Sequence, residues 1–196
     1  MAHSTREKIL AVSLRLFNEQ GYHHVTMRAI ADALSISVGN LTYHFAKKSD
    51  IVSALMDDAF EQMTATSDMP VESLTQIDRL FSMMLDTLCQ YAFFFLDSEL
   101  KTLSSGRHHI YFRVRLIDGL NTLAKNGFFM ESFTPEVCDT LVRLLLMSHI
   151  SWLNQTLRNS DSSGMSKAEF LHGHWLVLYP YLSEKGRIAY RQIRES

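Results

Sequence analysis

The chain has 196 residues, of which 46% are hydrophobic and 20% are charged, and its formal net charge is −2. This composition is that of a globular protein, and the length allows one domain or a small domain fused to a larger one. Eight glycines and three prolines are too few for a loop-rich all-β chain. Two cysteines far apart in the sequence indicate a reduced, cytoplasmic protein, and no apolar run is long enough to predict a membrane span.

The first predicted helix covers residues 5–20. Ser4 and Glu7 have the spacing of a capping box, in which each side chain bonds the backbone N–H of the other residue. Apolar residues then fall near one helical face, and Gly21 stands where a helix C-terminus favours a positive φ.

Two shorter helices are predicted next. Thr26 is a good N-cap for a helix over 27–34, and Ser37 is one for a helix over 38–44. The three residues between these helices leave room for a tight turn, so the first three helices have the outline of a helix-turn-helix.

The remainder of the chain also predicts helices without clear strand alternation, so the predicted fold class is all-α. The further predicted helices cover 48–66, 71–91, 94–103, 107–126, 135–157, 167–182 and 184–193. We therefore expect a helix-turn-helix domain over 1–48, a connecting helix over 49–66, and a larger helical domain over 67–196.

The third predicted helix has two distinct faces. With about 100° per residue, Leu41, Phe45 and Val38 form the face that points inward. The opposite face is small or hydrogen-bonding, with one aromatic residue and one cation. Its members are Gly39, Asn40, Thr42, Tyr43 and Lys47, with His44 at the boundary. Such a face suits a DNA major groove, and the alternative is a surface helical hairpin that binds no nucleic acid.

Several motifs in the first sixty residues are spaced as in a known family. They are Ile9-Leu10, Leu16-Phe17, Gly21-Tyr22, Thr26-Met27-Arg28-Ala29-Ile30-Ala31, Ile36-Ser37-Val38-Gly39-Asn40-Leu41-Thr42-Tyr43-His44-Phe45 and Lys48. This stretch resembles the N-terminal domain of TetR-family bacterial transcription regulators. The resemblance implies a homodimer that places two recognition helices in successive major grooves of a double-stranded, pseudo-palindromic operator. It also implies a second helical domain that binds a small effector and dimerises.

The resemblance also assigns roles to single residues. Thr26 is expected to cap the second helix and touch phosphate, Arg28 to reach the backbone or a groove edge, and Lys48 to meet phosphate. The expected DNA-contacting set on and before the third helix is Ser37, Val38, Asn40, Thr42, Tyr43 and His44.

Two positions depart from the family pattern. Ser35 stands in the turn where the family usually has glycine, which predicts a turn that is either slightly different or strained, because Ser tolerates the left-handed region poorly. Thr42 stands where the family commonly has tyrosine, so a phosphate contact made there is either lost or moved to Tyr43.

Aromatic residues concentrated in the second domain give a candidate ligand pocket, because ligand sites are mostly apolar with few polar groups. The candidates are Tyr91, Phe94, Phe95, Tyr111, Phe112, Arg115 and Trp152. The alternative is that these side chains fill a packed helical core.

Two long helices near the C-terminus are predicted to dimerise, since two from each subunit make a four-helix interface. Their apolar stripes supply the candidate contacts Leu141, Leu145, Trp152, Leu171, Trp175 and Leu178.

No metal site or cofactor is expected. Adjacent histidines such as His108 and His109 do not share a helical face, and His172 and His174 diverge on a helix. The chain also lacks a nucleophile elbow, a phosphate loop and a nucleotide fingerprint, which argues against an enzyme. The predicted function is a transcriptional regulator, specifically a repressor released by a small molecule. The alternatives are a DNA-binding protein with a structural or cell-division role and a helical enzyme.

Overall fold

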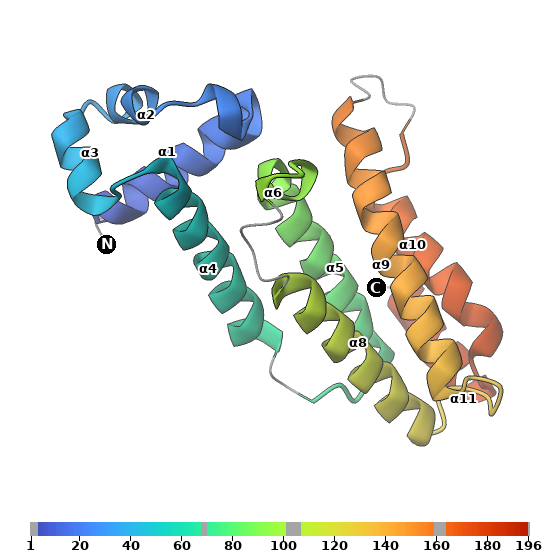
Figure 1. Ribbon diagram of the computed structural model, residues 1–196. Coiled ribbons are helices and arrows are strands. Elements are labelled where there is room, and N and C mark those ends of the chain that lie inside the picture. The colour runs from blue at the N-terminus through green and yellow to red at the C-terminus, as the bar shows by residue number, and fades with distance from the viewer. Residues whose placement is uncertain (1–3, 68–69, 101–106, 159–163, 196) are drawn as a thin grey trace. The chain divides into compact units, whose positions relative to one another are not determined.

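In a computed structural model of the chain, residues 4–67, 70–100, 107–158 and 164–195 are described, and they are predominantly α-helical (Figure 1). The helices are α1 (Thr5–Gln20), α2 (Met27–Ala33), α3 (Val38–His44), α4 (Lys48–Ser67), α5 (Leu74–Gln90), α6 (Ala92–Leu96), α8 (Arg107–Lys125), α9 (Pro135–Arg158), α10 (Lys167–Leu178) and α11 (Glu184–Glu195). Short 3-10 turns cover Tyr22–His24 and Tyr179–Tyr181. The predicted all-α fold class is confirmed. Among the described helices, none is both long and apolar enough to cross a membrane.

Local capping chemistry sets the bounds of the first three helices. Ser4 and Glu7 form the reciprocal capping box, with the Glu7 backbone N–H 3.2 Å from Ser4 Oγ and the Ser4 N–H 2.9 Å from a Glu7 carboxylate oxygen. Thr26 Oγ1 accepts from the Ala29 N–H at 3.1 Å, and Ser37 Oγ accepts from the Asn40 N–H at 3.0 Å. All three predicted helix starts are therefore confirmed.

Two predicted helices end earlier than their apolar patterns indicate. The helix predicted over 94–103 stops at Leu96, because Asp97 is extended and its Oδ1 accepts the N–H groups of Glu99 and Leu100 at 2.9 and 3.1 Å. Residues 101–103 of that prediction lie outside the described residues. The helix predicted over 167–182 stops at Leu178, since the 3-10 turn that follows contains Pro180, which cannot donate a backbone hydrogen bond.

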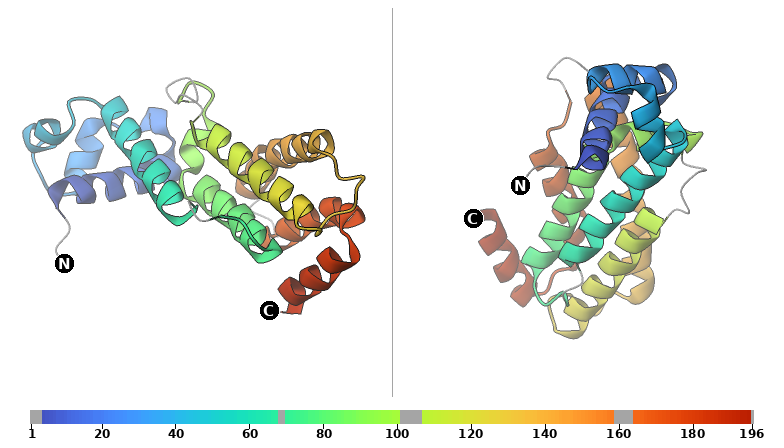
Figure 2. Two further views of the ribbon diagram at one scale, coloured as in Figure 1. Left: turned by 90° about the horizontal axis from the view of Figure 1, so that it is seen from below. Right: turned by 90° about the vertical axis from the view of Figure 1, so that its left-hand side faces the viewer.

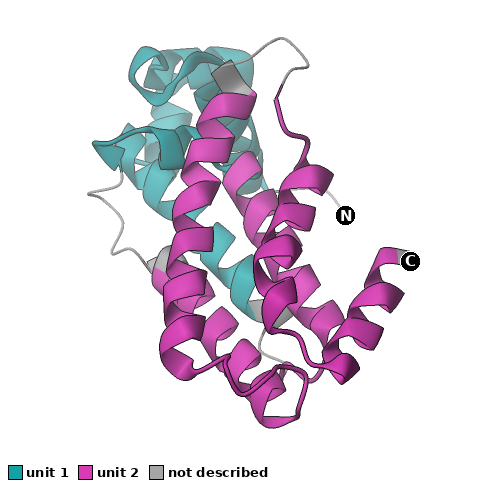
Figure 3. Cartoon of the chain, turned by 90° about the vertical axis from the view of Figure 1, so that its right-hand side faces the viewer, with its two compact units in different colours: residues 1–65, 90–105 teal, residues 66–89, 106–196 magenta. Residues whose placement is uncertain are grey.

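The chain divides into two compact units, coloured in Figure 3. Unit 1 comprises residues 1–65 and 90–105, and unit 2 comprises residues 66–89 and 106–196. The segment containing α6 therefore belongs to the same unit as the helix-turn-helix, although it falls within the range 67–196 predicted for the larger domain. The functional roles expected for the two parts stay predictions.

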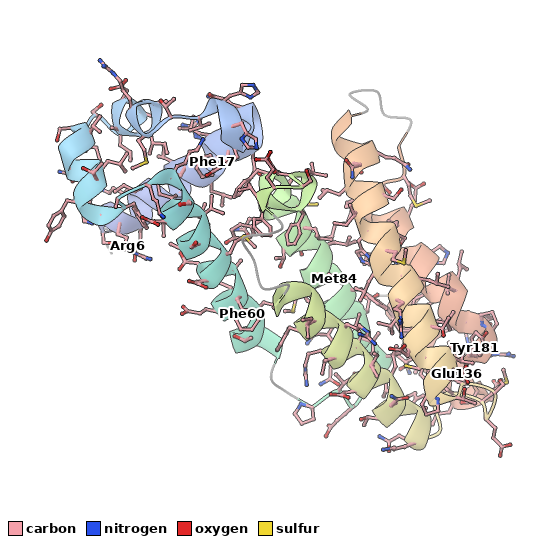
Figure 4. The ribbon with its side chains drawn as sticks, viewed as in Figure 1. Arg6, Phe17, Phe60, Met84, Glu136 and Tyr181 are labelled. Carbon is pink, nitrogen blue, oxygen red and sulfur yellow. The ribbon has the colours of Figure 1, made fainter. Side chains whose placement is uncertain are left out.

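Unit 1 includes α6 because α1 binds it through both apolar and polar contacts. The rings of Phe17 and Phe93 lie 5.1 Å apart between centroids, and Phe17, labelled in Figure 4, is fully buried. Asn18 of α1 donates through Nδ2 to the Gln90 carbonyl at 2.8 Å, and its Oδ1 accepts from the Phe93 N–H at 3.0 Å. A side-chain amide thus satisfies the backbone where α5 ends and α6 begins.

Unit 2 contains α5 and the helices from α8 onward, and Figure 2 shows the chain from two further sides. Its core contains both tryptophans, and each indole N–H has a partner. Trp175 donates to Asp78 Oδ1 at 2.7 Å, and Trp152 donates to the Met165 carbonyl at 2.8 Å. These bonds tie α10 to α5 and the end of α9 to the residues before α10.

A buried histidine pair joins α9 and α10. His149 and His174 are each about 1% exposed, and their Nε2 atoms lie 3.2 Å apart. Burial lowers the pKa of His174, and this effect is opposed by a contact of its Nδ1 with the Phe170 carbonyl and by the charge of Asp78. The folded protein therefore resists protonation of His174 at a pH where an unfolded histidine accepts a proton.

We predict that unit 2 loses stability when the pH falls below about 6.5, the ordinary histidine pKa. Protons then bind the unfolded chain more readily than the folded one, so the free energy of unfolding falls by at most about 1.4 kcal/mol per pH unit for one such group. Urea unfolding followed by tryptophan fluorescence between pH 5 and 8 measures this slope in unit 2, because both tryptophans lie there.

The variant His174→Gln should flatten that slope even if it lowers stability at every pH. His24→Gln, which changes an exposed histidine of unit 1, should leave the slope unchanged. Equal slopes in the parent and His174→Gln would contradict the prediction.

Candidate nucleic-acid interface

Helix α3 is held by one buried face and presents the other to solvent. Leu41 is fully buried and Phe45, its C-cap, is nearly so, which confirms both as inward residues. Arg6 of α1, labelled in Figure 4, places its guanidinium 5.4 Å from the Phe45 ring centroid. Val38 is 41% exposed, so its assignment to the inward face is wrong and it belongs to the exposed surface.

The turn before α3 adopts the strained geometry, one of the two outcomes expected from its sequence. Ser35 has a φ of 54°, in the left-handed region that favours glycine. The Ile36 N–H that follows bonds the Ala31 carbonyl at 3.0 Å and closes the turn. Ser35 therefore holds a left-handed conformation at an energetic cost of about 1–2 kcal/mol.

Gly39 leaves the centre of the exposed face bare. A Cβ built at this position would meet only Ser37 Oγ, at an ordinary contact distance of 3.8 Å. Packing within the chain therefore does not require glycine here, although glycine costs a helix about 0.5–1 kcal/mol relative to alanine. A bare helix surface is what close approach to a groove floor requires.

The polar groups around Gly39 are not equally available for hydrogen bonds to DNA. Thr42 donates its hydroxyl proton to the Gly39 carbonyl at 3.1 Å, so that proton is committed inside the helix. Asn40 is exposed, and Tyr43 is 85% exposed with its ring edge toward His44 at 5.3 Å between centroids. This arrangement favours Tyr43 over Thr42 as the residue that reaches phosphate.

Helix α2 and its N-cap add two exposed residues that are candidates for contacts with DNA. Thr26 caps the helix as predicted and remains exposed. The Arg28 side chain is also exposed, and its Nε lies 3.8 Å from Asp32 Oδ2, too long for a hydrogen bond. Its guanidinium is held loosely at the surface.

Lys48 has partners within the chain, and its predicted contact with phosphate stays a prediction. Its Nζ donates to the carbonyls of Tyr22 and Val25 at 2.5 and 2.7 Å, and lies 4.0 Å from the Tyr22 ring centroid. Burial also lowers the pKa of Lys48. The ammonium group thus stabilises the loop that leads into α2, and the exposed cation at this corner is Lys47.

The predicted pocket residues divide between the two units. Tyr91, Phe94 and Phe95 lie in unit 1, where the first two are buried in the core around α1. Tyr111, Phe112, Arg115 and Trp152 lie in unit 2, where Phe112 and Trp152 are buried. The geometry favours a core role for the buried ones, and their role as a ligand pocket stays a prediction.

The predicted dimer residues are mostly internal. Leu145, Trp152, Trp175 and Leu178 are buried within unit 2, while Leu141 and Leu171 are half-buried. The apolar residues that α9 and α10 expose are different ones, namely Leu144 (57% exposed), Met147 (72% exposed), Leu176 and Val177. The stripe that packs the core and the stripe available to a partner lie on different faces of the same helices.

Within the part of the chain that the structure describes, no group of three or more histidine, cysteine or acidic side chains could hold a metal ion. The side chains of His108 and His109 lie outside that description.

Comparison with known proteins identifies the region that carries this interface. Residues 9–55 match the family model described as "Bacterial regulatory proteins, tetR family". A crystal structure of a TetR-family transcriptional regulator from Marinobacter aquaeolei VT8 is 26% identical, with a TM-score of 0.80 and 98% of each chain covered. Residues 9–55 thus match the TetR family, and the chain as a whole shares the fold of a TetR-family regulator.

Two other proteins show how far along the chain the similarity reaches. The HTH-type transcriptional regulator UidR of Escherichia coli (strain K12) is 32% identical over 77 residues, which is 39% of each protein. The match therefore spans about two fifths of the length of that curated relative. A putative transcriptional regulator from Saccharomonospora viridis, solved in complex with choline, shares the fold with a TM-score of 0.73 at 19% identity, covering 91% of this chain and 98% of that one.

We predict that Lys48→Ala destabilises the loop before α2. Loss of two charge-assisted hydrogen bonds should lower local stability by about 1–3 kcal/mol. Amide hydrogen exchange of residues 22–30, without DNA, measures the effect. Lys47→Ala removes the neighbouring exposed cation and should leave these exchange rates unchanged. Parent-like protection in Lys48→Ala would contradict the prediction.

Proposed function

We propose that the chain is a transcriptional regulator that binds operator DNA through α3 and acts as a homodimer. The observation that carries the proposal is the exposed face of α3, bare at Gly39 and fixed in rotation by the buried Leu41 and Phe45. This face lies within the residues that match the TetR family model. In a helix-turn-helix, such a helix enters the major groove and its N-terminal residues contact base edges.

The DNA-contacting residues that we propose divide by chemistry. Val38 and Asn40 are placed to meet base edges, while Thr26, Arg28 and Tyr43 are placed to reach the backbone or a groove edge. The names of the family relatives favour regulation over a structural, cell-division or enzymatic role. A bacterial operator lies in the cytoplasm, so the proposed activity places the chain there.

The proposed homodimer uses the exposed apolar residues of α9 and α10. Leu144 and Met147 lie three positions apart on α9, and Leu176 and Val177 are adjacent on α10. Exposed apolar side chains of this kind mark interaction surfaces, and a partner copy would remove them from water.

The proposed sign of regulation is repression, relieved by a small-molecule effector bound in the larger helical domain. The choline complex of the Saccharomonospora viridis protein supports the view that this fold can hold a small ligand. Relief of repression requires that the effector bind the DNA-incompetent arrangement more tightly than the competent one.

We predict that Asn40→Ala weakens binding to a selected operator by about 1–3 kcal/mol and leaves binding to random duplex nearly unchanged, because an amide that reads a base edge matters only at the specific site. Fluorescence anisotropy across a salt series measures both affinities. Asn126→Ala in unit 2 is the matched control, with circular dichroism to check folding. Parent-like operator affinity in a folded Asn40→Ala would count against α3 as the reading helix.

We also predict that Met147→Glu dissociates the dimer, because it places a charge in the exposed apolar stripe of α9. Light scattering at micromolar concentration should give twice the chain mass of 22.5 kDa for the parent and a single chain mass for the variant. Met130→Glu, at another exposed methionine of unit 2, should remain dimeric. A dimeric Met147→Glu would exclude this face as the interface.

A further inference from the structure

The side chains of α3 offer an unusual selection of chemistry for reading base pairs. Its seven residues, VGNLTYH, contain no arginine, lysine, aspartate or glutamate. Arginine and lysine are the side chains that read guanine by its two acceptors, and acidic side chains read the cytosine amino group. Helix α3 therefore lacks the groups that select a G·C pair most strongly.

One edge of the exposed face carries methyl groups. Val38 and Thr42 are four residues apart, so they neighbour each other along the helix, and both are exposed. Because the Thr42 hydroxyl proton is donated to the Gly39 carbonyl at 3.1 Å, it is not available to a base acceptor. This edge therefore presents the methyl groups of Val38 and Thr42 to a base. The apolar group that a base presents in the major groove is the 5-methyl of thymine.

The other edge carries an amide. Asn40 lies two residues after Val38 and two before Thr42, which places it across Gly39 from both on a helix. The Asn40 backbone N–H is used by the Ser37 cap at 3.0 Å, while its side chain is exposed. An asparagine amide pairs with adenine through the adenine amino group and N7.

The remaining α3 residues do not change this selection. His44 is half-buried at the C-terminal end of the helix, with its ring against Tyr43. His44 is the last residue of α3, two positions beyond Thr42, whereas recognition helices contact bases mainly through their earlier residues. Arg28, which has the chemistry to read guanine, belongs to α2 and not to α3.

We propose that α3 selects operator half-sites whose central pairs are A·T, with thymine methyl groups against Val38 and Thr42 and an adenine against the Asn40 amide. This specificity rests on the operator binding proposed above. It assigns thymine methyl recognition to Thr42, a position that departs from the family pattern of tyrosine.

Selection of bound sequences from a randomised duplex pool by the full chain tests the base preference. The expected result is enrichment of A·T pairs at the centre of each half-site. Any preference for a G·C pair should lie elsewhere in the half-site and should disappear when the selection is repeated with Arg28→Ala. Enriched G·C pairs at the centre that survive Arg28→Ala would overturn the inference and leave DNA binding intact. Selection that enriches no sequence would overturn the proposed function together with the inference.

A thymine-to-deoxyuridine exchange tests the methyl contact itself. In the selected operator, removing the 5-methyl at the thymine that meets Thr42 should weaken parent binding about three- to fivefold, as expected for one buried methyl group. The matched variants are Thr42→Ser, which keeps the hydroxyl, and Thr42→Val, which keeps a methyl group at each branch.

The two variants have opposite expectations. Thr42→Ser should bind the thymine and deoxyuridine operators equally well, and Thr42→Val should keep the parent preference for thymine. Circular dichroism verifies that both variants fold. The inference fails if deoxyuridine at every central position leaves parent affinity unchanged, or if Thr42→Ser retains the parent preference.

Discussion

Burial of Leu41 and Phe45 is the constraint on which the proposed DNA surface depends. A seven-residue helix is too short to be stable alone, so packing decides both that α3 forms and how it is rotated. Once these two side chains are inside, Gly39 and Tyr43 must face outward, with Val38 and Thr42 on one flank and Asn40 on the other. Burial of these two side chains in the core therefore decides which side chains of α3 are exposed to DNA.

The scaffold around α3 is held by polar bonds across long stretches of sequence. Lys48 binds the Tyr22 and Val25 carbonyls before α2. Asn18 in turn binds the backbone at the end of α5 and within α6. Each bond satisfies a backbone group in a segment without a regular ladder, where an unpaired group would be costly. The reading helix is therefore positioned by residues that touch no DNA in the proposed complex.

Unit 2 divides the apolar residues of α9 and α10 between two faces. One face packs around Trp175 and the His149–His174 pair, and the other leaves Leu144 and Met147 in water. In the sequence, the apolar residues of each helix form one continuous stripe. In the folded chain, part of that stripe is buried in the core and part is exposed. The exposed residues that we propose for the interface lie one or two positions away from the residues predicted by helical periodicity.

Much of unit 1 follows from the sequence alone. Ser4, Thr26 and Ser37 set helix starts through bonds to residues three positions away, so the capping pattern predicts them without knowledge of the fold. The inward rotation of Leu41 and Phe45 follows from helical periodicity for the same reason.

Tertiary structure decides what depends on distant residues. The role of Lys48 depends on carbonyls more than twenty positions earlier, and the position of α6 in unit 1 depends on Asn18, some seventy positions before it. The same holds for the exposure of Val38 and for which leucines of α9 are buried. No local sequence pattern predicts these contacts, because each forms only when helices from separate parts of the chain pack together.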